Sequence, residues 1–212
     1  TYLNHLSKEL GFTISFKKQI NNNDYANQKT TVQELLYDKI SGSMTNGMFI
    51  SDVVNPMGIN KIYGKKVKKL SGGELQRLSI TLCLGENANI YLIDEPSSSL
   101  DIEYRFTTTK VIKRFLLHNK KIGFIVEHDI LMSTSLAKET TSKIIVFEEV
   151  KNENNVRYCE TTPLLDFKTG MNLFLKSINT TFRIDKGNNR PKINKFGSVM
   201  DNEQKNKNVY YQ

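Results

Sequence analysis

Apolar residues follow a helical spacing at the start of the chain and over a long section after it. Tyr2, Leu3, Leu6 and Leu10 predict a short helix that ends at Gly11. Residues 30–84 have helical periodicity as well, with loops that contain glycine and proline between the periodic stretches. We therefore expect a helical section between two parts that have a different pattern.

Short apolar stretches elsewhere predict β-strands. Residues 12–16 alternate between apolar and polar positions, whereas residues 90–93, 122–126 and 143–147 are apolar runs typical of buried strands. A helix is expected from Ile102 to Leu117 between two of these runs, and another before the last run. Alternation of strand and helix predicts an α/β fold with a parallel sheet and crossover helices.

The C-terminal part has a third pattern. From Thr162 onward, apolar residues are spaced as on one face of an amphipathic helix, and a basic, asparagine-rich tail follows. The sequence contains no internal repeat.

Composition excludes several classes of protein. The 212 residues have a mass of 24.3 kDa, and their 38% hydrophobic and 25% charged content excludes a mostly disordered or collagen-like chain. Cys83 and Cys159 are too few for a disulfide scaffold or a four-cysteine metal site, so a reducing compartment is expected. The longest apolar runs are strand-sized, and we expect no membrane span.

The excess positive charge lies in two places. The chain has a net charge of +8, and the segment from Lys61 to Lys69 contains five lysines and no acid. Residues 182–212 carry seven basic residues and three acids. Clustered positive charge suits a polyanion, although a solvated lysine-rich loop and a charged tail explain the same pattern.

The string Leu70-Ser71-Gly72-Gly73-Glu74-Leu75-Gln76-Arg77 is the sharpest chemical feature. Ser71 is a good N-cap, and the two glycines allow a ligand to approach the backbone at the start of a helix. Free N–H groups at such a helix start bind anions. A plain N-cap beside a flexible loop would explain Ser-Gly-Gly alone.

Two carboxylates follow the apolar run Ile90-Tyr91-Leu92-Ile93. Asp94 and Glu95 are expected at the carboxyl end of a buried strand, where ligands bind in doubly wound sheets. The first carboxylate suits Mg²⁺, and the second can polarise an attacking water. The alternative is a pair of exposed acids at a strand end.

Three further residues are candidates by their position. His128 ends the next apolar strand, so it is expected at the same sheet edge as the two carboxylates. Asp101 closes the string Ser98-Ser99-Leu100-Asp101, and Gln19 follows the first strand. A single histidine is more often structural than catalytic, and Gln19 is unremarkable by itself.

In combination these motifs resemble the ATP-binding cassette ATPases. Residues 70–77 match the signature motif of that family, residues 90–95 its Walker B strand, and residues 98–101 its D-loop. His128 matches the H-loop and Gln19 the Q-loop. The resemblance implies a P-loop NTPase-like core with an inserted helical subdomain.

The resemblance also implies a role for each candidate residue. Asp94, with Gln19, would hold Mg²⁺, and Gln19 would also contact the nucleotide and link the metal site to the helical subdomain. Glu95 would orient or deprotonate water, and His128 would contact the γ-phosphate of ATP. Ser71 and Gly73 would serve the nucleotide held by a second, partner cassette. The remaining candidates for nucleotide binding are Gly72, Gln76 and Asp101.

The tail narrows the resemblance to subfamily E, the ribosome-recycling ATPases. Thr181-Phe182-Arg183 and Arg190-Pro191-Lys192-Ile193-Asn194-Lys195 are similar to the C-terminal hinge segment of the second cassette in that subfamily. This implies a soluble, cytoplasmic twin-cassette ATPase that splits ribosomal subunits, with rRNA and release or initiation factors as partners. Iron–sulfur clusters would belong to a region outside these 212 residues. Residues 61–69 and the tail would be candidates for contact with rRNA or with the partner cassette.

The sequence departs from the family in three places. Ser98-Ser99 stands where the subfamily usually has Ala-Tyr in the D-loop, and the stretch from Lys138 to Lys143 is a few residues longer than expected. No Gly-x-x-x-x-Gly-Lys-Ser/Thr string, the Walker A loop that holds the β- and γ-phosphates, occurs in the 212 residues. We expect the chain to be a segment that starts just after this loop, and to be inactive alone.

The motifs suggest a division into four parts. Residues 1–28 would be a remnant of the core with the Q-loop, 29–85 the helical subdomain, 86–160 the core with Walker B, D-loop and H-loop, and 161–212 the C-terminal helix and basic hinge. A non-catalytic interaction module derived from a decayed cassette is the main alternative. A transporter cassette would leave the hinge segment unexplained, and a chromosome-maintenance head would need long heptad repeats.

Overall fold

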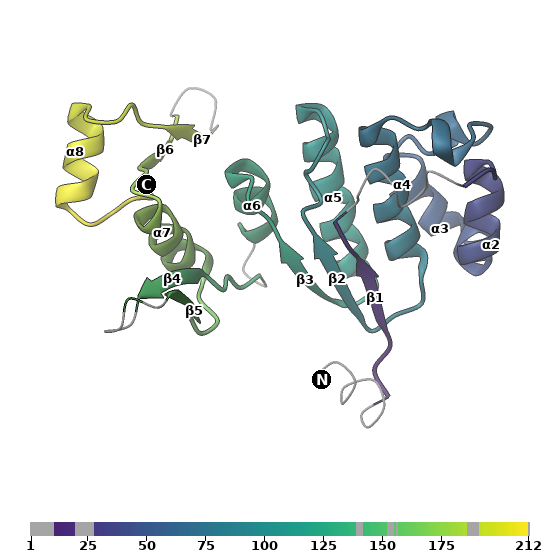
Figure 1. Ribbon diagram of the computed structural model, residues 1–212, viewed down its shortest axis with the longest axis horizontal. Coiled ribbons are helices and arrows are strands. Elements are labelled where there is room, and N and C mark those ends of the chain that lie inside the picture. Colours follow the sequence, from purple (N-terminus) through teal and green to yellow (C-terminus); the bar gives the residue numbers. More distant parts are fainter. Residues whose placement is uncertain are drawn as a thin grey trace. The chain divides into compact units, whose positions relative to one another are not determined.

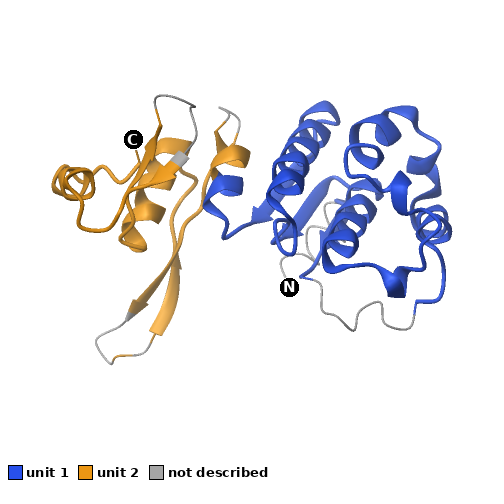
Figure 2. Cartoon of the chain, turned by 90° about the horizontal axis from the view of Figure 1, so that it is seen from above, with its two compact units in different colours: residues 1–133 blue, residues 134–212 orange. Residues whose placement is uncertain are grey.

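The computed structural model describes residues 11–19, 28–138, 142–151, 155, 157–185 and 191–211. The expected helix from Tyr2 to Leu10 lies outside the described residues. The chain divides into two compact units, residues 1–133 and residues 134–212 (Figure 2). Within the described residues, no helix is both long and apolar enough to cross a lipid bilayer.

A parallel sheet forms the centre of the first unit. Its strands are β1 (Ile14–Lys17), β2 (Ile90–Asp94) and β3 (Ile122–Val126), in that spatial order (Figure 1). Helix α5 (Ile102–His118) connects β2 with β3. Since all three strands are parallel, their carboxyl ends lie at one edge of the sheet. The expected parallel arrangement and the expected helix between β2 and β3 are confirmed.

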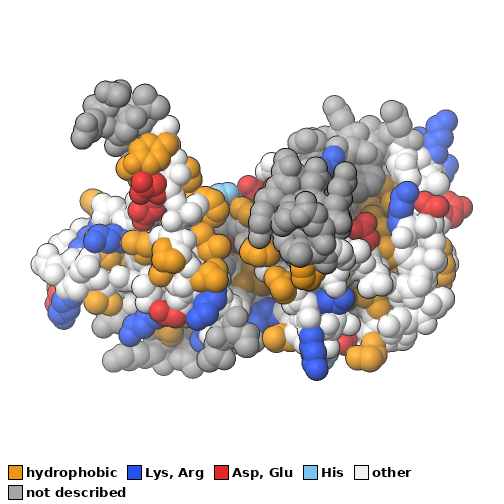
Figure 3. Space-filling view, turned by 90° about the horizontal axis from the view of Figure 1, so that it is seen from below, with side chains coloured by type: hydrophobic (Ala, Val, Ile, Leu, Met, Phe, Trp, Pro, Cys, Tyr) orange, Lys and Arg blue, Asp and Glu red, His pale blue; other side chains and the backbone are white. Residues whose placement is uncertain are grey.

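The two faces of this sheet have different surroundings. On one face, Tyr91 and Ile93 are each 1% exposed, and the Tyr91 ring packs edge-on against Phe115 of α5. The opposite face leaves Phe16 60% and Phe124 51% exposed, and hydrophobic side chains are visible at the surface of the molecule (Figure 3). The prediction that residues 122–126 form a buried strand is therefore wrong for the face that carries Phe124.

Several short helices fill the section between β1 and β2, as the sequence predicts. They are α2 (Val32–Met44), α3 (Gly47–Phe49), the π-helix η1 (Ile50–Val54), the 3₁₀-helices η2 (Asn60–Ile62) and η3 (Val67–Lys69), and α4 (Gly72–Gly85). Their apolar stripes form a core that includes Val32, Leu36, Val53, Met57, Ile59 and Leu78, all 0% exposed. Helix α4 also packs against β1 and β2, so this core is continuous with one face of the sheet.

The second unit contains a hairpin where another parallel strand was expected. Strand β4 (Phe147–Lys151) pairs antiparallel with β5 (Arg157–Thr161) in a separate sheet. The prediction of a third buried strand over residues 143–147 is therefore wrong: within it, Ile144 forms only an isolated bridge with Leu165. A Cβ added at Gly170 would lie 2.6 Å from the Cβ of Ile144, so this apolar run packs against a helix instead.

The remaining elements of the second unit follow the hairpin. They are α7 (Phe167–Ser177), β6 (Phe182–Ile184), β7 (Pro191–Ile193) and α8 (Val199–Asn206), while α6 (Ile130–Ala137) begins before the division between the units. The helix expected from Thr162 begins at Phe167 because Asp166 caps it, accepting a hydrogen bond from the Thr169 backbone N–H at 3.1 Å.

Buried polar residues hold the C-terminal segment in place. Asp201 is 1% exposed and accepts hydrogen bonds from the Thr181 hydroxyl at 2.5 Å and the Gly197 backbone N–H at 2.9 Å. Its carboxylate also forms an ion pair with Lys205 at 3.0 Å. Asn194, from the segment that resembles the hinge, donates to the Thr181 hydroxyl at 3.0 Å. The basic tail thus contains an ordered network in its described part.

Candidate functional site

The candidate site lies at the carboxyl edge of the parallel sheet. Gln19 follows β1, Asp94 ends β2 and is followed by Glu95, and His128 follows β3. Parallel pairing brings these strand ends together although they are distant in the sequence. All of them belong to the first unit.

The carboxylate of Glu95 lies between two of the predicted residues. The Gln19 side-chain amide donates a hydrogen bond to Glu95 Oε2 at 2.8 Å. On the other side, His128 Nε2 is 3.5 Å from Glu95 Oε1, with the imidazole 78% exposed and the carboxylate 27% exposed. The structure therefore brings Gln19, Glu95 and His128 together, as expected from the motifs.

The backbone of Glu95 is held as firmly as its side chain. Its φ of +43° is in the left-handed region, which a residue other than glycine adopts at a cost. Its N–H donates to the Val126 carbonyl at 2.9 Å. Its carbonyl accepts from the Gln76 side-chain amide at 2.8 Å and from Lys17 Nζ at 3.4 Å. These contacts come from β1, β3 and α4, and they stabilise the strained conformation.

Lys17 is a residue of the site that the sequence reasoning missed. It is 2% exposed, and its ammonium donates to the Asp94 carbonyl at 2.5 Å as well as to Glu95. Burial lowers the pKa of Lys17, and the nearby carboxylates of Asp94 and Glu95 partly oppose this effect. The sequence gives no signal for it, because the alternation over residues 12–16 puts Lys17 on the polar side of the strand, and only the structure shows that this side is the covered face.

The glycine-rich turn forms a well-capped helix start. The Ser71 hydroxyl accepts from the Glu74 backbone N–H at 3.3 Å, and the Glu74 carboxylate accepts from the Ser71 backbone N–H at 3.0 Å. This reciprocal pair is a capping box, and it confirms that Ser71 is the N-cap of α4. Lys65 adds an ion pair with Glu74 at 2.7 Å. Partial burial raises the pKa of Glu74, but the hydrogen bonds from Lys65 and Ser71 outweigh it and leave that pKa lowered.

The glycines of this turn pack against the loop that follows β2. A Cβ added at Gly73 would lie 2.9 Å from the Ser99 carbonyl oxygen, closer than such atoms approach one another. A Cβ at Gly72 would lie 3.4 Å from the Ser99 Cβ, which is close but tolerable. Ser99 itself has a φ of +60°. The glycine at position 73 therefore permits a close approach between the signature-like turn and the loop of residues 98–101.

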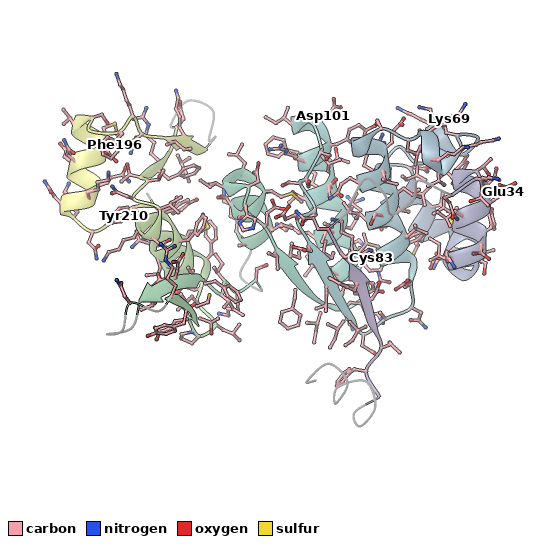
Figure 4. All side chains as sticks on the ribbon, viewed as in Figure 1. Glu34, Lys69, Cys83, Asp101, Phe196 and Tyr210 are labelled. Carbon is pink, nitrogen blue, oxygen red and sulfur yellow. The ribbon has the colours of Figure 1, made fainter. Side chains whose placement is uncertain are left out.

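Asp101 has a local structural role. Its carboxylate accepts a hydrogen bond from the Tyr104 backbone N–H at 2.9 Å and caps the N-terminus of α5 (Figure 4). Gln76 is likewise engaged, because its amide is 2% exposed and bound to Glu95. The structure thus places these two predicted residues where they position neighbouring segments.

Glu127 connects the loops after β2 and β3, and the sequence reasoning did not include it. Its carboxylate accepts from the Ser97 hydroxyl at 2.5 Å, from the Ser97 backbone N–H at 3.2 Å and from the Asp129 backbone N–H at 3.1 Å. Asp129 in turn forms an ion pair with Arg105 at 2.5 Å. An acid between an apolar strand and His128 was the signal available in the sequence.

The donors at the sheet edge fit a magnesium ion that is completed by phosphate oxygens. Asp94 and Glu95 supply carboxylates, and the Gln19 amide supplies a carbonyl oxygen while its nitrogen binds Glu95. Among the described residues there is no group of three or more His, Cys, Asp or Glu that could hold a metal. Mg²⁺ in nucleotide sites is bound by one or two carboxylates together with phosphates and water, so such a site does not need three protein carboxylates or imidazoles.

Taken together, the arrangement suits the activation of a water molecule. Glu95 is partly exposed, oriented by Gln19, and close to an exposed imidazole that can donate to an anionic oxygen.

Comparison with known proteins gives a consistent result. The family model described as ABC transporter matches residues 3–98. ABC transporter E family member 1 of Arabidopsis thaliana is 47% identical to this chain, over 94% of this chain and 31% of the relative. Translation initiation factor RLI1 of Saccharomyces cerevisiae is 50% identical, over 85% of this chain and 28% of the relative. The chain thus spans about a third of the length of these curated relatives.

Solved structures agree with the sequence relatives. The archaeal ribosome recycling factor aABCE1, in complex with the ribosomal stalk protein aP1, matches with a TM-score of 0.80 and 38% identity, over 95% of this chain and 37% of that one. A model of ribosome-bound archaeal Pelota and ABCE1 matches with a TM-score of 0.84 and 36% identity, over 99% of this chain and 35% of that one.

Proposed function

Because this chain belongs to the ABC ATPases and is homologous to the ABCE1 and RLI1 proteins, we propose that it forms part of an ATP-hydrolysing cassette that acts in ribosome recycling. ABC ATPase domains bind ATP with Mg²⁺, and the homologues take part in translation and ribosome recycling.

The residues at the sheet edge have different roles in ATP hydrolysis. Asp94 and Gln19 would hold Mg²⁺, which would neutralise charge on the phosphates. Glu95 accepts a proton from the attacking water, and Gln19 keeps its carboxylate in the required orientation. His128 donates a hydrogen bond to the γ-phosphate. The main support for this assignment is that the Glu95 carboxylate lies between the side chains of Gln19 and His128.

The signature residues serve a second nucleotide. Ser71, Gly72 and Gly73, at the capped start of α4, bind phosphate oxygens of ATP held by a partner cassette. Gln76 and Asp101 contribute by positioning, since their side chains are bound to Glu95 and to the first turn of α5. ATP binding would close the two cassettes and hydrolysis would reopen them.

The 212 residues alone would not hydrolyse ATP. They contain no Gly-x-x-x-x-Gly-Lys-Ser/Thr string, so they lack the backbone nest and lysine that hold the β- and γ-phosphates. The intact geometry around Glu95 nevertheless argues against a decayed, non-catalytic cassette, because an unused site would not need to keep Gln19 and His128 beside it.

The proposal extends to the cellular role. A ribosome-recycling ATPase would act in the cytoplasm, split ribosomal subunits and bind rRNA and release or initiation factors. A solved relative in complex with a ribosomal stalk protein and another bound to the ribosome with Pelota support this assignment. Iron–sulfur clusters would belong to a part of such a protein outside these residues.

A chimaera tests the proposal directly. The chain would replace the matching segment of yeast RLI1, which supplies a Walker A loop and a partner cassette. ATP hydrolysis and separation of 80S ribosomes into subunits would be measured for the chimaera and its Glu95→Gln variant. With the equivalent glutamate of the partner cassette replaced by glutamine in both proteins, so that only the site of Glu95 can hydrolyse ATP, we expect the Glu95→Gln variant to lose hydrolysis by about 100-fold or more, the size typical of a missing general base.

A matched variant separates catalysis from folding. Glu203→Gln removes an exposed acid from α8, in the second unit, and should leave hydrolysis unchanged. An active chimaera whose rate is insensitive to Glu95→Gln would overturn the assignment of Glu95. A folded chimaera that binds ATP but neither hydrolyses it nor splits ribosomes would favour the non-catalytic alternative.

A further inference from the structure

The segment from Lys61 to Lys69, here called the lysine segment, is the strongest concentration of charge outside the sheet-edge site. Its five lysines are all exposed, and the segment contains no acid. It ends two residues before Ser71, the N-cap of α4. The sheet-edge chemistry makes no use of it.

The lysine segment has a defined backbone. Ile62 is 4% and Val67 1% exposed, so its apolar side chains point into the core while the lysines face outward. The Val67 backbone N–H donates to the Thr30 carbonyl at 3.0 Å, and the Val32 N–H at the start of α2 donates to the Lys65 carbonyl at 3.0 Å. These anchors preorganise the positive charges, which reduces the entropy lost on binding.

Two acids lie close to the lysines, from α4 and α2. Glu74 is paired with Lys65 at 2.7 Å. Glu34 is exposed, and the Thr31 backbone N–H and hydroxyl, with a smaller contribution from Lys66, lower its pKa. Lys69 and Glu34 both lie at the outer edge of the helical part (Figure 4). Within the described residues, no ion pair joins an acid to Lys61, Lys66, Lys68 or Lys69.

The lysine segment also forms an open hollow. Gly64, Lys65, Lys66 and Lys69 line it. No buried polar side chain lies among these residues to fix a single small ligand. A shallow site with several separate positive charges suits a polymer of phosphates better than a single nucleotide.

We propose that the lysine segment binds the phosphate backbone of RNA. An acidic protein is a poorer fit, because protein interfaces need apolar anchors and both Ile62 and Val67 are buried. Lysines act as point charges without a fixed geometry for base edges, so the contact would be independent of RNA sequence. The choice of RNA over DNA rests on the proposed ribosomal function, whereas the phosphate contact rests on the charge alone.

The test uses the full 212-residue chain and a fluorescent 20-nucleotide RNA of mixed sequence. Fluorescence anisotropy would give the dissociation constant at several KCl concentrations. A variant with glutamine at positions 61, 66, 68 and 69 removes the unpaired lysines. The matched control has glutamine in place of Lys110, Lys138, Lys168 and Lys176, which are also exposed, so both variants fall from a net charge of +8 to +4. Thermal unfolding followed by circular dichroism would verify that both fold.

We expect the segment variant to bind RNA at least about 10-fold more weakly than the control variant at 100 mM KCl. For four phosphate contacts the wild-type affinity should fall about 50-fold between 50 and 200 mM KCl, and this dependence should be lost in the segment variant. A DNA strand of the same sequence should bind similarly.

Equal losses in both variants would overturn the proposal, because net charge alone would then explain binding. Stronger binding of a poly-glutamate peptide than of RNA would overturn it in favour of an acidic protein partner. Neither result would affect the ATPase assignment, which depends on Glu95 and is read from hydrolysis by the chimaera.

Discussion

The side-chain amide of Gln76 donates a hydrogen bond to the backbone carbonyl of Glu95 at 2.8 Å. Gln76 lies on α4, five residues after its N-cap Ser71, while Glu95 follows the central strand β2. One partly buried hydrogen bond therefore joins the helix that begins at the signature-like turn to the backbone of the residue whose carboxylate is proposed to activate water. A displacement of α4 would be transmitted to the backbone of Glu95 through this hydrogen bond.

Removing this contact should destabilise the first unit. Gln76→Ala leaves the Glu95 carbonyl with only the longer bond from Lys17 at 3.4 Å. We expect a loss of about 1–3 kcal/mol in the free energy of unfolding, the usual cost of an unsatisfied buried polar group. Urea denaturation would measure it. As a control, Gln33→Ala removes an exposed amide from α2 and should change the free energy of unfolding by less than about 0.5 kcal/mol. Equal losses of stability in the two variants would contradict a role for the Gln76 contact.

The two glycines of the signature-like turn should respond differently to the same substitution. Gly73→Ala places a Cβ 2.9 Å from the Ser99 carbonyl oxygen, so the loop of residues 98–101 must move. We expect a cost of about 1–3 kcal/mol, as for other overpacked sites. Gly72→Ala meets Ser99 at 3.4 Å and should be within about 0.5 kcal/mol of wild type. Thermal melts of both variants would test this, and an equal effect would argue against close packing at Gly73.

Asp201 should make the second unit sensitive to acid. Hydrogen bonds from the Thr181 hydroxyl and the Gly197 N–H, together with Lys205, lower the pKa of this carboxyl in the folded state. Stability from a lowered carboxyl pKa is present above the unfolded value of 3.8 and is lost as the pH falls through the folded value. Asp201→Asn should therefore lower the melting temperature at pH 7, and this difference from wild type should shrink as the pH falls below 3.8.

A control at an exposed position isolates this effect. Asp38 has a side chain that is 68% exposed, and Asp38→Asn should alter the melting temperature little at either pH. A difference between wild type and Asp201→Asn that stays constant from pH 7 to pH 3 would show that ionisation of Asp201 is not the cause.

The two thiols should differ strongly in reactivity. Cys83 is 4% exposed, and burial raises the pKa of its thiol to about 11, whereas Cys159 is exposed. Since the thiolate is the reactive form, Ellman's reagent at pH 8 should modify one thiol quickly in the native chain and both in guanidinium chloride. Cys159→Ser should abolish the fast reaction. Rapid modification of the Cys159→Ser variant would show that Cys83 is accessible, and would contradict its burial where α4 packs against β1.

Some elements could be predicted because their signals are local. The apolar run that became β2 ends at its two carboxylates, and Asp101 caps α5, so strand, loop and helix follow from neighbouring residues. The segment of residues 143–147 has an equally apolar sequence, but its last residue joins a hairpin with Arg157–Thr161. An apolar run alone does not specify its partner strand, and here the partner was a local antiparallel strand in a different unit.

In the candidate site, too, some residues could be predicted from local signals and others could not. The residue types and spacing of the motifs identified Gln19, Glu95 and His128, and parallel strands necessarily bring their ends to one edge. Lys17 and Glu127 were not singled out, because their importance arises from hydrogen bonds to residues 77 and 30 positions away. The hydrogen bond from Gln76 to Glu95, 19 positions away, likewise emerges only from the fold.

The sequence by itself determined the motifs, the capping of α4, the parallel sheet and the family resemblance. These features depend on short-range periodicity, on side-chain bonds within one helical turn and on the order of residues along the chain. The tertiary structure alone decided which face of the sheet is covered, that Gln76 and Lys17 both bind the Glu95 carbonyl, and that Gly73 lies against Ser99. Such contacts require the register of the sheet and the packing of α4 upon it, which place groups distant in sequence within hydrogen-bonding distance.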